Sequence, residues 1–218
     1  MSHELLKRIL TSLVLLPILI YSTYYSGIYF ILFLSFIYIF SFYEVLKNTK
    51  NLLTIAISNI VLIFSLYCFF TLRGDTNYSL LTIYWILMAT FFSDIGGYLF
   101  GKIFKGKKLT KISPNKTYSG SIGSIILSTS SLIFLGFVQK FFFNENLINF
   151  FQYKYLLITI FISIICQIGD LYVSFWKRKI NIKNTSNILP GHGGVLDRID
   201  GLIFVLIFSF MLLKIGFI

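Results

Sequence analysis

Long apolar runs almost free of charge are the feature that most limits what this chain can fold into. The stretch GLIFVLIFSFMLL at residues 201–213 is one of several such runs. Uninterrupted apolar segments of about 18 residues or more are typical of helices that cross a membrane. Only 12% of the residues are charged, against about a quarter in soluble domains. The sequence therefore predicts an all-α, polytopic transmembrane helical bundle.

The apolar runs predict about seven membrane spans joined by polar segments. They are expected near residues 9–26, 28–43, 52–72, 79–101, 120–138, 155–174 and 201–218. With the N-terminus placed in the cytoplasm, fifteen basic residues fall on the cytoplasmic side and four fall outside or near the far end. An excess of cytoplasmic lysine and arginine sets the orientation of membrane proteins, so we expect the N-terminus inside and the C-terminus outside. The net charge of +11 then favours membrane lipids as a partner, and no nucleic acid is expected.

The two halves of the chain differ in the residues that could carry chemistry. Residues 1–78 consist of N-terminal spans joined by short polar tips. Residues 79–218 hold nearly all the glycine clusters, two of the three prolines and five of the eight acidic residues. We therefore expect a catalytic transmembrane region at 79–218, with its active site at the cytoplasmic face.

Four carboxylates are expected to converge on that face: Asp94, Asp170, Asp197 and Asp200. Like charges at one interface repel one another unless basic side chains or a bound cation lie between them. Mg²⁺ is commonly held by one or two carboxylates together with substrate phosphate oxygens. Asp197 and Asp200 are three residues apart, so both can point inward from one helical face. The alternatives are a structural cap, a lysine partner, or a loop salt bridge in which Arg198 neutralises the pair.

Two polar segments carry residue types that bind phosphate. SPNKTYSG contains Ser113, Lys116 and Thr117, although it lacks the GxxxxGK[ST] pattern of a Walker A loop. GHGG contains His192, Gly193 and Gly194, and glycines let backbone N–H groups approach a phosphate closely. The alternatives are a solvated basic loop for the first segment and a helix break capped by histidine for the second. The glycines of DIGGYLFG and SGSIGS are expected to serve close helix packing.

The segment SFWKRKINIKNTSNILPGHGGVLDRID resembles the motif of phosphatidate cytidylyltransferases, also called CDP-diacylglycerol synthases. The matching positions are Ser174, Lys177, Arg178, Lys183, Ser186, Pro190, His192, Gly193, Gly194, Asp197, Arg198 and Asp200. The stretches SDIGGYLFGKIFKGKKLTKISPNKTYSG and GDLYVSFWKR resemble two further regions of that family. One position departs from the pattern, because Asn184 stands where the family has an aspartate.

The resemblance implies an enzyme that converts CTP and phosphatidic acid into CDP-diacylglycerol and pyrophosphate, with Mg²⁺ as cofactor. It implies metal binding by Asp170, Asp197 and Asp200, with Arg198 and His192 as further catalytic residues. Substrate binding is expected of Asp94, Ser113, Lys116, Thr117, Ser174, Lys177, Arg178, Lys183, Gly193 and Gly194. Within this set, we expect Lys177 and Arg178 to draw the phosphatidate headgroup to the interface.

The resemblance also bears on cofactors, assembly and location. The family also uses a monovalent cation such as K⁺, and the resemblance leaves open whether this chain does so beside Mg²⁺. A bacterial-type cell (inner) membrane is the expected location, and the oligomeric state is left open, a homodimer being one alternative.

Two other functions compete with this interpretation. A CTP-dependent lipid-alcohol kinase would also need a nucleotide and a metal ion at the cytoplasmic face. A transporter of a phosphorylated solute would show buried charge as well, but with internal repeats and broken helices near the midplane. Neither repeats nor such breaks are visible in the sequence, and the long motif favours the transferase.

Overall fold

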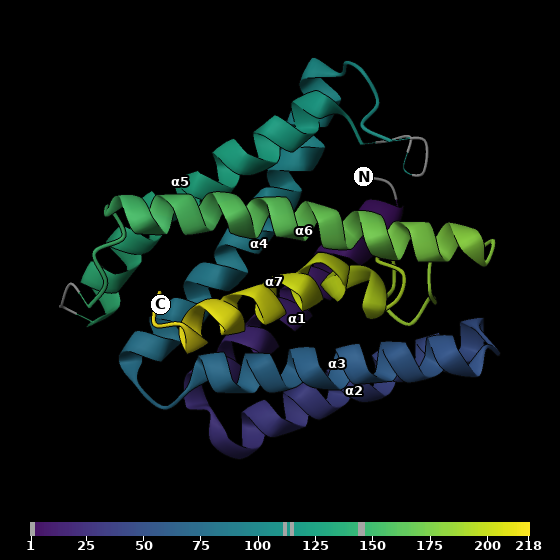
Figure 1. Cartoon of the computed structure of the whole chain (residues 1–218), viewed down its shortest axis with the longest axis horizontal. Helices are drawn as coiled ribbons and strands as arrows, with labels where there is room; N and C mark the ends of the chain where they lie inside the picture. Colours follow the sequence, from purple (N-terminus) through teal and green to yellow (C-terminus); the bar gives the residue numbers. More distant parts are fainter. Residues whose placement is uncertain (1–2, 111–112, 114–115, 144–146) are drawn as a thin grey trace.

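A computed structural model describes residues 3–110, 113, 116–143 and 147–218. Within this part of the chain, seven α-helices follow one another without any strand (Figure 1). They are α1 (His3–Tyr25), α2 (Gly27–Asn48), α3 (Leu52–Arg73), α4 (Asn77–Phe104), α5 (Tyr118–Phe143), α6 (Tyr153–Lys179) and α7 (Leu196–Lys214). The predicted all-α architecture is confirmed, with one helix at each expected span.

Most helices extend a few residues beyond the predicted spans, and polar side chains cap the starts of two of them. Asn51 begins α3, because its side chain accepts hydrogen bonds from the N–H groups of Leu53 and Thr54. Thr76 and Ser79 form a capping box at the start of α4. The last helix begins before the predicted span of 201–218, at Leu196, and ends earlier, at Lys214. Gly216, with φ +73°, adopts the left-handed conformation that commonly terminates a helix.

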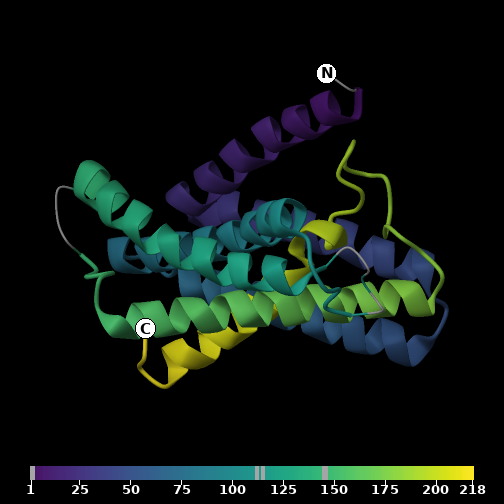
Figure 2. The same cartoon turned by 90° about the horizontal axis from the view of Figure 1, so that it is seen from above.

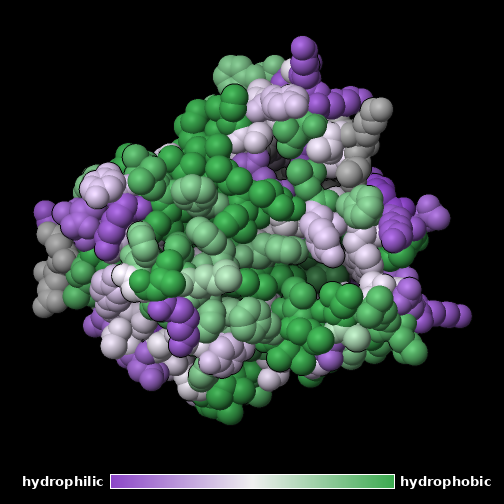
Figure 3. All heavy atoms as spheres, in the orientation of Figure 1, coloured by the Kyte–Doolittle hydropathy of each residue, from purple (hydrophilic) through white to green (hydrophobic). Residues whose placement is uncertain are grey.

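The connecting segments gather at two opposite ends of the bundle. One end, at the right of Figure 1, holds the chain's N-terminus, the α2–α3 turn and the segments that follow α4 and α6. Figure 2 shows the N-terminus and the segment between α6 and α7 at the same end. Hydrophilic residues gather towards the two ends of the face drawn in Figure 3, with a broad hydrophobic region between them. The chemistry-bearing loops therefore share one end of the molecule.

Five of the helices in the described chain are long and apolar enough to cross a membrane: α2 to α6. In α1 the apolar stretch is shorter and covers Leu10–Tyr25. The first five residues of α7 include three charged ones, Asp197, Arg198 and Asp200. The chain is thus an all-helical, integral-membrane type of protein with five clear candidate spans.

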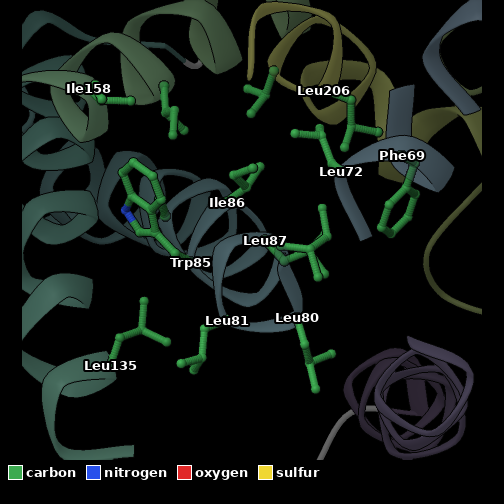
Figure 4. Packing of buried hydrophobic residues seen from close by; sticks show 14 of the residues in the cluster. Phe69, Leu72, Leu80, Leu81, Trp85, Ile86, Leu87, Leu135, Ile158 and Leu206 are labelled. Atoms are coloured by element: carbon green, nitrogen blue, oxygen red, sulfur yellow. The ribbon is translucent and has the colours of Figure 1, made fainter. Parts of the chain in front are cut away.

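One hydrophobic core joins the two halves of the chain. It surrounds α4, where the fully buried Trp85 packs among side chains from the neighbouring helices (Figure 4). Trp85 Nε1 donates to Thr159 Oγ1 at 2.9 Å, so the indole also ties α4 to α6. Phe69 and Leu72 of α3 belong to the same cluster as Leu206 of α7. The N-terminal spans therefore pack directly on the helix that carries the motif.

Glycines allow two helix pairs to approach unusually closely. A Cβ on Gly96 of α4 would lie 2.4 Å from the carbonyl oxygen of Gly123 on α5. A Cβ on Gly201 of α7 would lie 2.9 Å from the carbonyl oxygen of Cys166 on α6. Small residues at such crossings let membrane helices pack backbone to backbone. The predicted packing role of the DIGGYLFG and SGSIGS glycines is confirmed.

Candidate active site

Two carboxyl groups meet where α6 and α7 cross. Asp170 follows Gly169 on α6, and Asp200 precedes Gly201 on α7. A Cβ on Gly169 would lie 2.5 Å from the Phe204 ring, so side chains larger than glycine would push the helices apart. The carboxyl groups of Asp170 and Asp200 lie within hydrogen-bonding reach of each other. Glycines next to both acids thus explain locally how the two charges come together.

Two lysines compensate this negative charge from opposite sides. Lys116 lies just before α5, and its Nζ is 2.5 Å from Asp170 Oδ2. Lys177 Nζ, near the end of α6, lies 2.8 Å from Asp197 Oδ1 and 4.0 Å from Asp200 Oδ2. Because Lys177 is only 8% exposed, its ammonium group belongs to the interior of the cluster. The partner of Asp197 and Asp200 is therefore Lys177, whereas Arg198 is exposed.

Asp197 also organises the segment that precedes α7. Its Oδ2 accepts hydrogen bonds from the N–H groups of Thr185, at 2.9 Å, and Gly194, at 3.0 Å. With Lys177 on Oδ1, both of its oxygens are engaged by the protein. The four predicted carboxylates thus differ in surroundings, because Asp170 and Asp200 face each other and Asp197 faces the loop.

Asp94 lies on the α4 side of the same cluster. Its Oδ1 accepts a weak hydrogen bond from Cys166 Sγ at 3.5 Å. Nearby, Ser93 and Ser163 share a hydrogen bond of 2.8 Å that links α4 to α6. Interhelical hydrogen bonds of this kind hold membrane helices in register. Asp94 is therefore placed by helix packing close to Asp170 and Asp200, but with a separate partner.

A pocket of about 700 Å³ opens beside the segment between α6 and α7. His192 lies 3.5 Å, Nε2 to Oγ, from Ser12 of α1, and Thr11 Oγ1 donates to the carbonyl of Pro190 at 2.8 Å. These contacts hold α1 against the segment, and Lys7 of α1 contributes to the lining of the pocket. Its lining residues are mostly basic or polar: Lys7, Lys183, Asn184, Asn187, Leu189, Pro190, Gly191, His192, Gly193 and Arg198. Such a cavity is suited to a polyanion.

The glycines of this segment serve its tight fold. Gly191 and Gly193 have φ +74° and +88°, a region open to glycine at little cost. The N–H of Leu189 donates to the carbonyl of Gly193 at 2.9 Å, closing a turn that presents His192 to the pocket. Gly194 is buried, and a Cβ there would collide with the Thr185 hydroxyl and a neighbouring carboxylate.

The remaining predicted residues lie around these two features. Thr117 caps α5, since its Oγ1 accepts from the N–H of Gly120 at 3.1 Å. Ser113 lies in the turn that precedes α5, and its backbone carbonyl accepts a hydrogen bond from the N–H of Lys116. Arg178 is exposed and donates to the carbonyl of Ile182, whereas Ser174 is partly buried on α6. Of the expected headgroup ligands, only Arg178 is accessible, because Lys177 is enclosed by the aspartates.

Sequence reasoning missed two residues that the structure brings to this region. Glu44 of α2 is fully buried and bonds the segment before α7. Lys7 of α1 lines the pocket. In the sequence alone, Lys7 enters only the count of basic residues that sets the membrane orientation. Glu44 falls in a short polar segment between two predicted spans. The one signal for Glu44 was its rarity, since the chain has only eight acidic residues.

Comparison with known proteins places this arrangement in context. Residues 46–216 match the family model described as the cytidylyltransferase family. A phosphatidate cytidylyltransferase of Rickettsia conorii is 31% identical over 211 residues, covering 94% of this chain and 89% of the relative. A Bacillus subtilis protein of the same name is 34% identical, covering 78% of this chain and 62% of the relative. For a third, from Staphylococcus haemolyticus, 41% identity extends over 63% of this chain and half of the relative.

Proposed function

This chain belongs to the cytidylyltransferase family, and on that premise we propose that it makes CDP-diacylglycerol from CTP and phosphatidate. A phosphate oxygen of phosphatidate attacks the α-phosphorus of CTP, and the bond from that phosphorus to the bridging oxygen of pyrophosphate breaks. The nucleophile is already ionised, so no strong general base is required. The obstacle is electrostatic, because two polyanions must meet at a membrane surface.

The observation that carries this proposal is the facing pair Asp170 and Asp200, flanked by Lys116 and Lys177. Alternating positive and negative groups can hold a cation and phosphate oxygens in fixed positions. Preorganised charges of this kind stabilise the charge that develops on a transferring phosphoryl group. Lys116 is the partly exposed cation of the set, with 26% of its side chain accessible. It is therefore the lysine that we assign to a substrate phosphate.

The same pair fits the divalent metal ion that this chemistry calls for. Among the described residues, no group of three or more His, Cys, Asp or Glu side chains is arranged to hold a metal alone. Mg²⁺ does not need such a group, since one or two carboxylates, water and substrate phosphates suffice. Asp170 and Asp200 would hold it, whereas we assign Asp197 to the loop because backbone N–H groups and Lys177 engage its oxygens. When bound, the ion neutralises phosphate charge at the reacting centre.

The basic pocket is the proposed site for the nucleotide's phosphates. Lys7, Lys183 and Arg198 supply positive charge, and the turn at Gly191–Gly193 brings backbone close to the ligand. Asn184 lines the same pocket and lies beside Gly193. In this position an amide can bond a phosphate or ribose group, so Asn184 in place of the family's aspartate is compatible with nucleotide binding.

We further propose that the end of the bundle with these loops faces the cytoplasm, in an inner membrane, with the N-terminus inside and the C-terminus outside. Support comes from the fifteen basic residues assigned to that side, against four on the other. It also comes from the clustering of the N-terminus with the segments after α4 and α6 (Figures 1 and 2). CTP is a cytoplasmic solute in this account.

Two differently labelled forms of CTP test the reaction. Membranes containing the chain are incubated with phosphatidate vesicles, Mg²⁺ and CTP labelled at either the α- or the γ-phosphorus. The proposal predicts α-label in the extracted lipid and γ-label in soluble pyrophosphate. Transfer of γ-label to lipid would identify a lipid kinase instead. Membranes with the Asp170→Asn variant serve as the control for background transfer.

A further inference from the structure

Glu44 is a buried carboxylate to which neither the motif nor the matched range assigns a role. It lies near the end of α2, two positions before the range 46–216 that matches the family. Its exposed fraction is 0%. A buried carboxylate is costly unless hydrogen bonds or charges compensate it. The question is what this acid does in the N-terminal half of the chain.

Four hydrogen-bond donors surround Glu44; three belong to the segment before α7, and the fourth is the N–H of the first residue of α7. Oε2 accepts from Thr185 Oγ1 at 2.7 Å and from the N–H of Leu196 at 2.9 Å. Oε1 accepts from Ser186 Oγ at 2.7 Å and from the N–H of Val195 at 2.8 Å. An ionised carboxylate offers about four acceptor positions. Glu44 is therefore saturated and has no oxygen left for a metal ion or a substrate proton.

These donors come from the two ends of one loop, so Glu44 closes it. Thr185 and Ser186 begin the loop, and Val195 and Leu196 end it at the start of α7. Val195 is the N-cap of α7, and its own side chain makes no capping bond. A carboxylate is favourable at a helix N-terminus, where N–H groups lack partners. Glu44 supplies that cap from a different helix.

Two further contacts strengthen the same link. Asn48, one turn after Glu44, donates through Nδ2 to the carbonyl of Thr185 at 2.7 Å. Asp197 bonds the N–H groups of Thr185 and Gly194 from the α7 side. The requirement for glycine at 194 follows, because a Cβ there would lie 2.5 Å from Glu44 Oε2. The first turn of α7, which carries Asp197 and is followed directly by Asp200, is thus fixed on α2.

We propose that Glu44 is a positioning residue for the reaction centre. By closing the loop of residues 185–196 and capping α7, it sets the depth and rotation at which Asp200 faces Asp170. The proposal rests on the function proposed above, because it assigns the purpose of that geometry to cytidylyl transfer. A purely structural role for Glu44 would leave the Mg²⁺ requirement of turnover unchanged, whereas a positioning role predicts that this requirement rises when Glu44 is replaced.

The test compares Glu44→Gln with Asp75→Asn. Asp75 is an exposed acid in the turn between α3 and α4, at the opposite end of the bundle, and its variant removes the same charge. In Glu44→Gln an N–H₂ group replaces one acceptor oxygen and faces one hydroxyl and one backbone N–H at the start of α7. We expect kcat to fall about 10- to 100-fold, as for other groups that orient metal ligands, with a higher Mg²⁺ requirement. The CTP KM should change much less, and Asp75→Asn should behave as wild type.

Trypsin sensitivity gives a second readout that does not depend on activity. Lys183 and Arg198 are exposed and flank the loop, so loosening the loop should speed cleavage at these sites in the folded, detergent-solubilised protein. Faster cleavage in Glu44→Gln, with unchanged helix content, supports the proposal. Wild-type cleavage, kcat and Mg²⁺ dependence in that variant would overturn it.

Ser186→Ala carries the test if Glu44→Gln fails to accumulate in the membrane. It removes one of the four donors and leaves the carboxylate in place. A several-fold lower kcat with faster cleavage is expected, and unchanged values for both would overturn the proposal. Failure of wild type itself to form CDP-diacylglycerol would instead refute the proposed function, and the cleavage result would still report on the loop.

Discussion

Replacing Gly201 by alanine should separate the two helices that bring Asp170 and Asp200 together. The added Cβ would lie 2.9 Å from the carbonyl oxygen of Cys166 and 2.7 Å from its sulfur. Ordinary contacts begin near 3.4 Å, so the α6 and α7 backbones must move apart by roughly 0.5 Å. The carbonyl belongs to the backbone of α6 and cannot rotate away as a side chain could.

The expected effect falls on catalysis rather than on folding. Overpacking costs about 1–3 kcal/mol, but alanine is favoured over glycine in a helix by about 1 kcal/mol. The variant should therefore remain folded. A displacement of about 1 Å at a reacting centre can cost roughly 100-fold in rate. Half of that displacement suggests a loss in kcat of about 10-fold.

The assay is initial-rate formation of CDP-diacylglycerol by purified protein in detergent, with the unfolding temperature measured on the same samples. Gly136→Ala is the matched control, because a Cβ there would meet only ring atoms of Phe151, at 3.3 and 3.5 Å. It should keep wild-type turnover. If Gly201→Ala is folded and turns over within twofold of wild type, the carboxylate pair does not depend on this helix contact and the reasoning fails.

Three further predictions follow from the charges and from the proposed orientation. Lys116→Ala should raise a substrate KM or abolish turnover without loss of protein from the membrane; wild-type kinetics would make its segment a solvated basic loop. Lys177→Met should leave Asp197 and Asp200 without their cation, and loss of one partner of a buried ion pair costs about 3–5 kcal/mol. Its unfolding temperature in detergent should therefore drop, and an unchanged value would contradict the interior placement of Lys177. The cysteines introduced in the Lys107→Cys and Asn181→Cys variants, beside the buried Cys68 and Cys166, should react with impermeant reagents only from the cytoplasmic side, and labelling from outside would reverse the topology.

The sequence predicts the helices well because their cause is local. Five of the apolar runs form helices long enough to span a membrane, and the observed helices differ from the predicted spans mainly by a few residues at their ends. The end of α7 was missed because the apolar run continues past Lys214, whereas the backbone turns at Gly216. The close helix crossings were also predictable, since glycine clusters are a local pattern.

The details of the site depend on contacts between distant residues and were predicted less completely. The position of Lys177 could have been found from helical spacing, because it lies seven residues after Asp170 and so shares its face. Arg178, its neighbour, then points elsewhere and is exposed. No local pattern connects Glu44 with Thr185, which is 141 residues away. Such a pairing is visible only once the chain has folded.

The measurement that tests the central claim most directly is a Mg²⁺ titration of CTP-dependent turnover in Asp170→Asn and Asp200→Asn, with Asp75→Asn as the control for loss of one charge. Asparagine preserves the shape of each side chain, so the variants should insert and fold. A bound metal ion contributes several kcal/mol to transition-state stabilisation, and about 3 kcal/mol corresponds to roughly 100-fold in rate. The account predicts a loss of at least about 100-fold in both variants, with a shifted Mg²⁺ requirement in any residual activity. Near-wild-type rates with an unchanged Mg²⁺ requirement in both variants would show that this carboxylate pair is not the reaction centre.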